Sequence, residues 1–228
     1  FAKKFGHTIK EIKPGLVPIL LNDKYIKQIE GLSLKNVKLV ATKQDKIFKE
    51  LFGEMLFTSL GISGPIVLSM SSYINREQNI KLYLDLKPAL TNEQLLNRIE
   101  RDINTNNMLQ IATLLSGLLP KSLVEPFLNK CNIEKTLKVK SLNIKQKQII
   151  AHYLKHFDLD FKELDKLDYG IITSGGINVK EIDPKTMESK IVPGLYFAGE
   201  VLDVDALTGG FNLQIAFTTG YVAGSSII

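Results

Sequence analysis

Apolar residues recur with three different periods along the chain, and the changes in period divide it into three zones. From 16 to 88 they tend to recur at every second position, most clearly from Ile80 to Lys87, where four even-numbered apolar residues alternate with more polar ones. A period near two is typical of a strand with one buried face. The turn sequence at 61–65 interrupts the pattern. Residues 16–88 are therefore predicted to be strand-rich.

Residues 89–167 change to the period of a helix. Apolar side chains recur at three- and four-residue spacing after Thr91 and again after Asn143. Each of these two residues is followed three positions later by a glutamine, which is the spacing of a capping box at a helix start. Two longer helices with shorter ones between them are predicted, and they are expected to form a small bundle packed on the strand-rich zone.

Residues 168–228 combine short apolar strands with glycine-rich turns. A buried strand is predicted at 169–173 and a second one at 195–198, and a glycine follows soon after each. A final helix is predicted from about 211, after a Gly-Gly pair. Alternating strands and helices of this kind indicate an α/β unit, so the fold class is mixed, α+β or α/β.

The residues that follow these strands are the candidate ligand-binding residues. A carboxylate at the carboxyl end of a strand can accept hydrogen bonds from sugar or ribityl hydroxyls. The amino end of a helix attracts negative charge. Each glycine alone is explained by a turn, but three such features close together in the sequence favour a ligand site. The candidates are Ser174, Gly175, Gly176, Gly199, Glu200, Asp205, Gly209, Gly210, Asn212, Leu213 and Gln214.

Composition excludes several classes of protein. The 228 residues, of which 44% are hydrophobic, are enough to bury a large core. The single cysteine, Cys131, excludes an intramolecular disulfide framework. No apolar run is long enough to cross a bilayer. These features predict a cytoplasmic protein with no membrane partner.

The net charge of +5 is unevenly distributed. Residues 1–50 carry eleven lysines against five acids, whereas residues 168–228 carry three lysines against seven acids. A lysine-rich face offers an alternative function, a non-catalytic module that binds RNA or a protein partner. The lysines are interleaved with apolar residues, and arginine, which makes most base-specific contacts, is scarce. Nucleic acid is therefore not an expected partner of this protein.

The candidate residues lie in sequence blocks that resemble a known bacterial family. Blocks 173–176, 181–190, 193–205 and 209–214 resemble the carboxyl-terminal block of the BaiN/YhiN-like (HI0933-like) family of FAD-dependent, NAD(P)H-linked oxidoreductases, and two shorter blocks at 6–9 and 53–65 extend the resemblance. The family has an FAD domain of the two-dinucleotide-binding (Rossmann-like) type, interrupted by an inserted domain of a β-barrel plus helices.

The resemblance assigns a place in this architecture to each zone. It implies that 1–15 is a remnant of the FAD domain with a linker, that 16–88 is the β-barrel part of the insert and 89–167 its helical part, and that 168–228 is the carboxyl-terminal segment of the FAD domain. The implied activity is hydride transfer from NAD(P)H, through FAD, to an unidentified small organic acceptor.

The resemblance also implies roles for the candidate residues. Gly199 and Glu200 would lie along the ribityl-pyrophosphate part of FAD. The start of the final helix, at Asn212, Leu213 and Gln214, would face the isoalloxazine ring, with 174–176 near the ring from the other side. No catalytic acid or base is singled out.

Two departures from the family pattern matter. The chain has no Gly-x-Gly-x-x-Gly turn for the pyrophosphate, so it resembles the carboxyl-terminal portion of a member, and the amino-terminal half of the FAD domain is its expected partner. Ser59 stands where members commonly have histidine. His152 and His156, four apart on a predicted helix, lack a third ligand, so no metal site is predicted.

Overall fold

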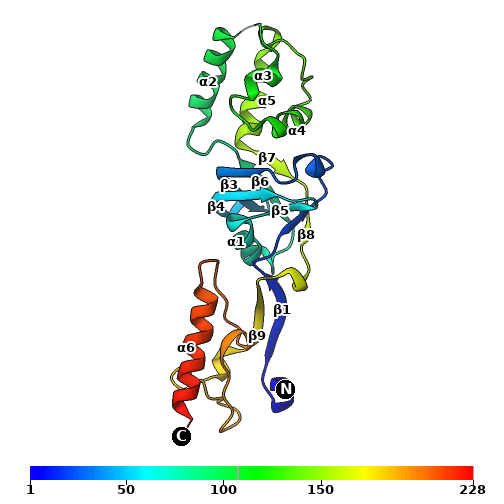
Figure 1. Cartoon of the computed structure of the whole chain (residues 1–228). Coiled ribbons are helices and arrows are strands. Elements are labelled where there is room, and N and C mark those ends of the chain that lie inside the picture. Colours follow the sequence, from blue (N-terminus) through cyan, green and yellow to red (C-terminus); the bar gives the residue numbers. More distant parts are fainter. Residues whose placement is uncertain (107, 228) are drawn as a thin grey trace. The chain divides into compact units, whose positions relative to one another are not determined.

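The computed structural model describes residues 1–106 and 108–227, and these residues form two compact units (Figure 1). The first unit combines residues 1–19, 67–78 and 164–228, and the second combines 20–66 and 79–163. The four zones assigned from the resemblance, with boundaries after residues 15, 88 and 167, stay a prediction.

The second unit is built on a seven-stranded sheet with the strand order β7-β6-β3-β4-β5-β2-β8. Its strands are β2 (Ile19–Leu21), β3 (Ser33–Lys43), β4 (Lys46–Phe57), β5 (Gly61–Ser63), β6 (Ile80–Asp85), β7 (Phe157–Leu159) and β8 (Phe161–Leu164). The long β3–β4 hairpin turns at Gln44 and Asp45, which both have the positive φ that a tight hairpin turn requires. The predicted strand at 80–86 is confirmed, because its even-numbered side chains are buried.

The second unit also contains the predicted helices. They are α2 (Asn92–Thr105), α3 (Ile111–Leu115), α4 (Lys121–Cys131) and α5 (Ile144–Lys155). Both capping boxes are confirmed. The Thr91 hydroxyl accepts a hydrogen bond from the Gln94 backbone N–H at 3.2 Å, and the Asn143 side chain accepts one from the Gln146 backbone N–H at 2.8 Å. α3 is shorter than its apolar stripe suggests, because the chain turns at Ser116–Leu119.

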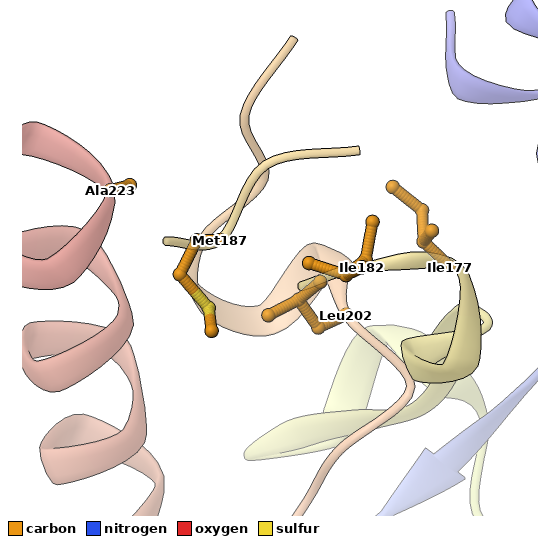
Figure 2. Close-up of a cluster of buried hydrophobic side chains, with 5 residues drawn as sticks. All are labelled: Ile177, Ile182, Met187, Leu202 and Ala223. Carbon is orange, nitrogen blue, oxygen red and sulfur yellow. The ribbon is translucent and has the colours of Figure 1, made fainter. Parts of the chain in front are cut away.

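The first unit pairs β1 (Ile9–Gly15) with β9 (Ile172–Ile177) in an antiparallel ribbon. It also contains most of α1 (Pro65–Ile74), a helix that the sequence analysis did not predict, and α6 (Phe211–Ser226). The first unit also has four short 3-10 helices: η1 (Ala2–Phe5), η4 (Leu167–Tyr169), η5 (Val179–Glu181) and η6 (Gly199–Val201). Two more, η2 (Ile26–Ile29) and η3 (Val139–Ser141), belong to the second unit. A small core holds the unit together (Figure 2), formed by Ile177, Ile182, Met187, Leu202 and Ala223.

Two predicted strands of the third zone differ from the structure. Tyr169 ends a 3-10 helix, and the strand begins at Ile172 and continues through Gly175 and Gly176, which were expected to follow the strand. The reason is tertiary, since β9 forms against β1, which lies far away in sequence. Residues 195–198 form no regular strand, because the isolated bridge from Tyr196 to Glu188 is the only strand-type pairing given for them among the described residues.

Candidate functional site

A cavity of about 440 Å³ lies within the first unit, where α6 begins. Five of the candidate residues line it: Glu200, Gly209, Gly210, Asn212 and Leu213. The rest of its wall comes from Leu16, Ile171, Ile172, Val204, Leu207, Thr208, Ile215 and Ala216. The cavity is therefore mostly apolar, with one carboxylate and the amino end of one helix in its wall.

The amino end of α6 has no side-chain cap. Gly210 occupies the N-cap position with a left-handed backbone, φ 85°, and Gly209 before it has φ 122°. The first intrahelical hydrogen bond from the backbone runs from the Gln214 N–H to the Gly210 carbonyl, at 3.0 Å. The N–H groups of the first turn are left for another partner, and the helix dipole adds about half a positive charge there.

Asn212 holds the loop that forms one side of the cavity. Its side-chain oxygen accepts a hydrogen bond from the Ala206 N–H at 2.8 Å, and its side-chain nitrogen donates one to the Ala206 carbonyl at 2.7 Å. Since Val204, Leu207 and Thr208 flank Ala206 and line the cavity, these two bonds fix the position of the wall relative to α6.

Glu200 joins η6 to β9. Its Oε1 accepts hydrogen bonds from the Thr173 backbone N–H, at 2.5 Å, and from the Thr173 hydroxyl, at 2.8 Å. The structure gives Oε2 no partner among the described residues, and the residue is exposed. Glu200 thus has one oxygen engaged in the fold and one that can accept a hydrogen bond from a ligand in the cavity.

The remaining candidate residues do not line this cavity. A Cβ on Gly175 would lie 2.3 Å from the Glu11 carbonyl oxygen, and one on Gly176 would lie 2.5 Å from the Val201 carbonyl oxygen, so close backbone packing accounts for both glycines. Ser174 is buried beside them. Their expected position near a flavin ring stays a prediction.

Three further candidates, Gly199, Gln214 and Asp205, also lie outside the cavity lining, and the first two make hydrogen bonds to α6 side chains. The Gly199 N–H donates to the Thr219 hydroxyl at 2.9 Å, and the Gln214 side chain donates to the Thr218 hydroxyl at 2.9 Å. Asp205 is half-buried. The apolar part of the wall was not predicted from the sequence, because it comes mainly from loops and turns in which hydrophobic residues follow no period.

The other residues considered from the sequence have structural surroundings. The buried His7 ring lies 2.8 Å, at Nε2, from the Ser189 hydroxyl oxygen and packs edge-on against Phe197. His152 and His156 stack on each other with centroids 5.4 Å apart. Within the described residues no group of three His, Cys, Asp or Glu side chains could hold a metal ion. A search of the same residues found no helix long and apolar enough to cross a membrane.

Cys131 is expected to be unreactive in the folded protein. Burial raises the pKa of its thiol to about 12, so the thiolate is rare at pH 8. Ellman's reagent at pH 8 should label the folded chain at least about a hundredfold more slowly than the chain in urea, where the pKa returns to about 8.5. Labelling at equal rates in both states would contradict this prediction. Because only the unfolded thiol ionises, folding stability should also fall as the pH rises above about 8.5.

Comparisons with known proteins cover the whole chain. The sequence profile of the HI0933-like protein barrel and H2TH domain matches residues 13–172. The chain is similar to a ribosomal RNA dihydrouridine synthase of Haemophilus influenzae (32% identical over 99% of the chain and 54% of that protein), and to the protein of the same name in Escherichia coli (31%, over 100% and 55%). It is also similar to a 3-dehydro-bile acid delta(4,6)-reductase of Clostridium scindens (28%, over 98% and 55%).

The chain therefore spans about half the length of the curated relatives that it matches. The matched profile covers the sheet and the helices of the second unit, together with α1 and the last three residues of β1. This match confirms the predicted mixed fold, with a barrel-plus-helices region ahead of the carboxyl-terminal segment. The chain belongs to the HI0933-like protein family.

Proposed function

We propose that the protein containing this chain is a flavin-dependent oxidoreductase and that the cavity beside α6 holds part of the flavin. FAD, when bound, supplies hydride transfer, for which NAD(P)H is the proposed reductant. The observation that carries the proposal is the uncapped amino end of α6 in the wall of an apolar cavity. Apolar walls suit a flat ring, and the helix end stabilises the negative charge of a reduced one.

The residues that would hold the flavin follow from this geometry. The first-turn N–H groups of α6 would face its most electron-rich edge, and Oε2 of Glu200 would accept a hydrogen bond from a hydroxyl group of the cofactor. Asn212 positions the loop wall and would act on the flavin through Ala206. These residues bind and orient the cofactor, and none of them is assigned a proton-transfer role.

The exposed apolar residues of α6 support the expected partner. Phe211, Leu213, Phe217 and Tyr221 are 59–77% exposed, and the last three recur every four residues along one side of the helix. We propose that the amino-terminal half of the FAD domain, with its phosphate-binding glycine turn, covers this side. A helix that presents so many large apolar side chains normally packs against another element.

The acceptor is proposed to carry a carbon–carbon double bond conjugated to a carbonyl group. The names of the three relatives describe products or substrates of this class: saturation of uridine to dihydrouridine, and reduction of an unsaturated 3-oxo bile acid. A hydride adds to the far carbon of such a bond, and the charge that develops on the oxygen needs stabilising. A small enone of this class would match the predicted small organic acceptor.

A uridine in RNA is the second candidate acceptor, and one feature of this chain favours it. Residues 135–156 contain six lysines and two histidines but no aspartate or glutamate. A segment with this composition attracts a polyanion. The two relatives named for ribosomal RNA are 31% and 32% identical to the chain, compared with 28% for the bile acid reductase.

The test is the visible absorbance of the purified full-length protein. We expect flavin bands, bleached by NADH or NADPH. Asn212→Ala should weaken flavin binding about tenfold, since loss of two hydrogen bonds to the Ala206 backbone frees the loop wall at a cost of about 1–2 kcal/mol. Thr218→Ala, which removes a side-chain bond at a residue that neither lines the cavity nor belongs to the candidate set, is the control. A colourless protein that also fails to bind added FAD would refute the proposal.

A further inference from the structure

A second cavity, of about 450 Å³, lies within the second unit and is lined by residues of the sheet and of the helices α2 and α5. β3, β4 and β6 provide its floor, with Lys38, Glu50, Tyr83 and Asp85 among the lining residues. α2 contributes Asn92 and Leu96. α5 and its C-cap contribute Gln148, Ala151, His152, Lys155 and His156. This cavity shares no residue with the proposed flavin cavity.

Three rings form a column in the wall of this cavity. The Tyr83 and His156 rings stack with centroids 3.6 Å apart and an angle of 20° between their planes. His156 in turn stacks on His152, at 5.4 Å and 16°. His152 is the exposed end of the column. Such a column can be extended by one more flat ring, which is how single-stranded nucleic acids bind to ring side chains.

The charges inside the cavity are already paired. Lys38 and Glu50 form an ion pair at 2.9 Å, and Lys155 and Asp85 form one at 2.6 Å. The cavity therefore has little net charge to attract a free anion. Its amides, Asn92 and Gln148, offer both donors and acceptors. Rings, amides and compensated charges together suit a neutral, planar heterocycle with polar edges, which is the chemistry of a nucleobase.

The segment 135–156, called the basic segment here, consists of α5, its C-cap and the nine residues that precede α5 in the sequence. Among the described residues the structure gives no ion pair for Lys138, Lys140, Lys145 or Lys147. Gln148 and His152 also line a separate hollow, of about 490 Å³, whose other lining residues include Lys145 and Lys130. Lys145 of α5 therefore lines the same hollow as His152, the exposed end of the ring column.

We infer that a single strand of RNA binds along α5, with one base on the His152 end of the ring column and its phosphates against the lysines of the basic segment. Bases are neutral and flat, and the backbone carries one charge per nucleotide, so a nearly neutral ring-lined cavity next to an acid-free run of lysines matches the strand in both respects. The inference rests on the proposed flavin-dependent function with RNA as acceptor, and it assigns an RNA contact to residues of the second unit, none of which lines the proposed flavin cavity.

Binding of a fluorescein-labelled, mixed-sequence RNA of about 12 nucleotides to the full-length protein tests the lysines. In the triple variant Lys138→Gln, Lys140→Gln and Lys145→Gln, the slope of log K against log salt should become shallower by about 2, since each lost phosphate contact contributes about 0.7. The matched control removes three exposed lysines of the first unit, Lys3, Lys4 and Lys10, in the same way. An equal effect of the two triple variants, or no RNA binding at low salt, overturns the inference.

Two variants of His152 test the base contact. His152→Ala should weaken RNA binding about tenfold, and His152→Phe should restore it, because a phenyl ring keeps the stacking face. If both variants bind like the wild type, no base stacks on the column and this part of the inference fails. Flavin absorbance is recorded for every variant. Missing flavin in the wild type refutes the proposed function, whereas intact flavin with unchanged RNA binding refutes only the RNA site.

Discussion

Replacing Gly175 by alanine is expected to destabilise the first unit by about 3 kcal/mol or more. The residue has φ 105°, a backbone conformation that costs an L-residue about 1–3 kcal/mol. The new Cβ would also lie 2.3 Å from the Glu11 carbonyl oxygen and 3.1 Å from Nη2 of Arg76. Overpacking of this kind typically costs a further 1–3 kcal/mol, roughly.

The neighbours of Gly175 have little freedom to move away. Arg76 donates from Nη2 to the Glu11 carbonyl at 2.8 Å and to the Ser174 carbonyl at 3.3 Å, so it ties both strands together at this point. β9 also leads into the cavity wall, through Ile172 and the Thr173 contacts of Glu200. Loss of the β1–β9 ribbon should therefore remove flavin binding together with local stability.

Hydrogen exchange followed by mass spectrometry can locate the damage. In Gly175→Ala, peptides covering β1 and β9 should exchange much faster than in the wild type. Gly220→Ala is the matched control, because a Cβ at this helical glycine would meet no atom within 4 Å and alanine is the better helix former. Unchanged protection of β1 and β9 in Gly175→Ala would show that the ribbon tolerates the methyl group.

The local features of the fold could be predicted from the sequence. The helices after Thr91 and Asn143 begin as expected, because a capping box involves residues only three positions apart. β6 follows from strict alternation, which depends only on which face is buried. The start of α6 was predicted because two glycines precede an apolar stretch, a pattern that is also complete within a few residues.

Features that depend on distant partners were not predicted. Gly175 and Gly176 were predicted to belong to the ligand site, with a turn as the alternative, whereas in β9 their positive φ lets the Glu11 and Val201 backbones approach closely. The helix α1 was not predicted because part of its support comes from a distant segment. The hydroxyls of Ser71 and Ser72 in α1 accept hydrogen bonds from the N–H groups of Val17 and Leu16, respectively. These contacts join residues that lie from 25 to 164 positions apart in the sequence, so they leave no periodic signal.

The same distinction separates the two cavities. Five candidate residues line the first cavity because a glycine-rich helix start shows in the sequence. The second cavity joins β3, β4, β6, α2 and α5, so its composition is visible only once the chain is folded. The two histidines at 152 and 156 were weighed as metal ligands because of their spacing, but their partner in space is Tyr83, a ring from a strand about seventy residues earlier.

Removing the Lys155 ammonium should destabilise the second unit by about 3 kcal/mol. Lys155, the last residue of α5, contacts Asp85 at 2.6 Å and donates to the carbonyls of Lys87 and Leu90 at 3.0 and 2.8 Å. Its side chain is 20% exposed and that of Asp85 is 12% exposed. Lys155→Met leaves the Asp85 carboxylate and two carbonyls without their partner, and breaking one side of a buried pair costs about 3–5 kcal/mol.

A double-mutant cycle isolates the ion pair from the loss of packing. The Asp85 side chain accepts a hydrogen bond from the Lys87 N–H at 2.9 Å. Asp85→Asn keeps a side-chain oxygen for this bond but removes the negative charge. Combined with Lys155→Met it should recover more than half of the loss in urea unfolding, because no carboxylate then stays buried without a partner. Lys162→Met, at a lysine whose ion pair is more than half exposed, is the control and should cost less than about 0.5 kcal/mol. A loss below about 1 kcal/mol in Lys155→Met would mean that the pair does not fasten α5 to β6, and the ring column beside it would then need another anchor.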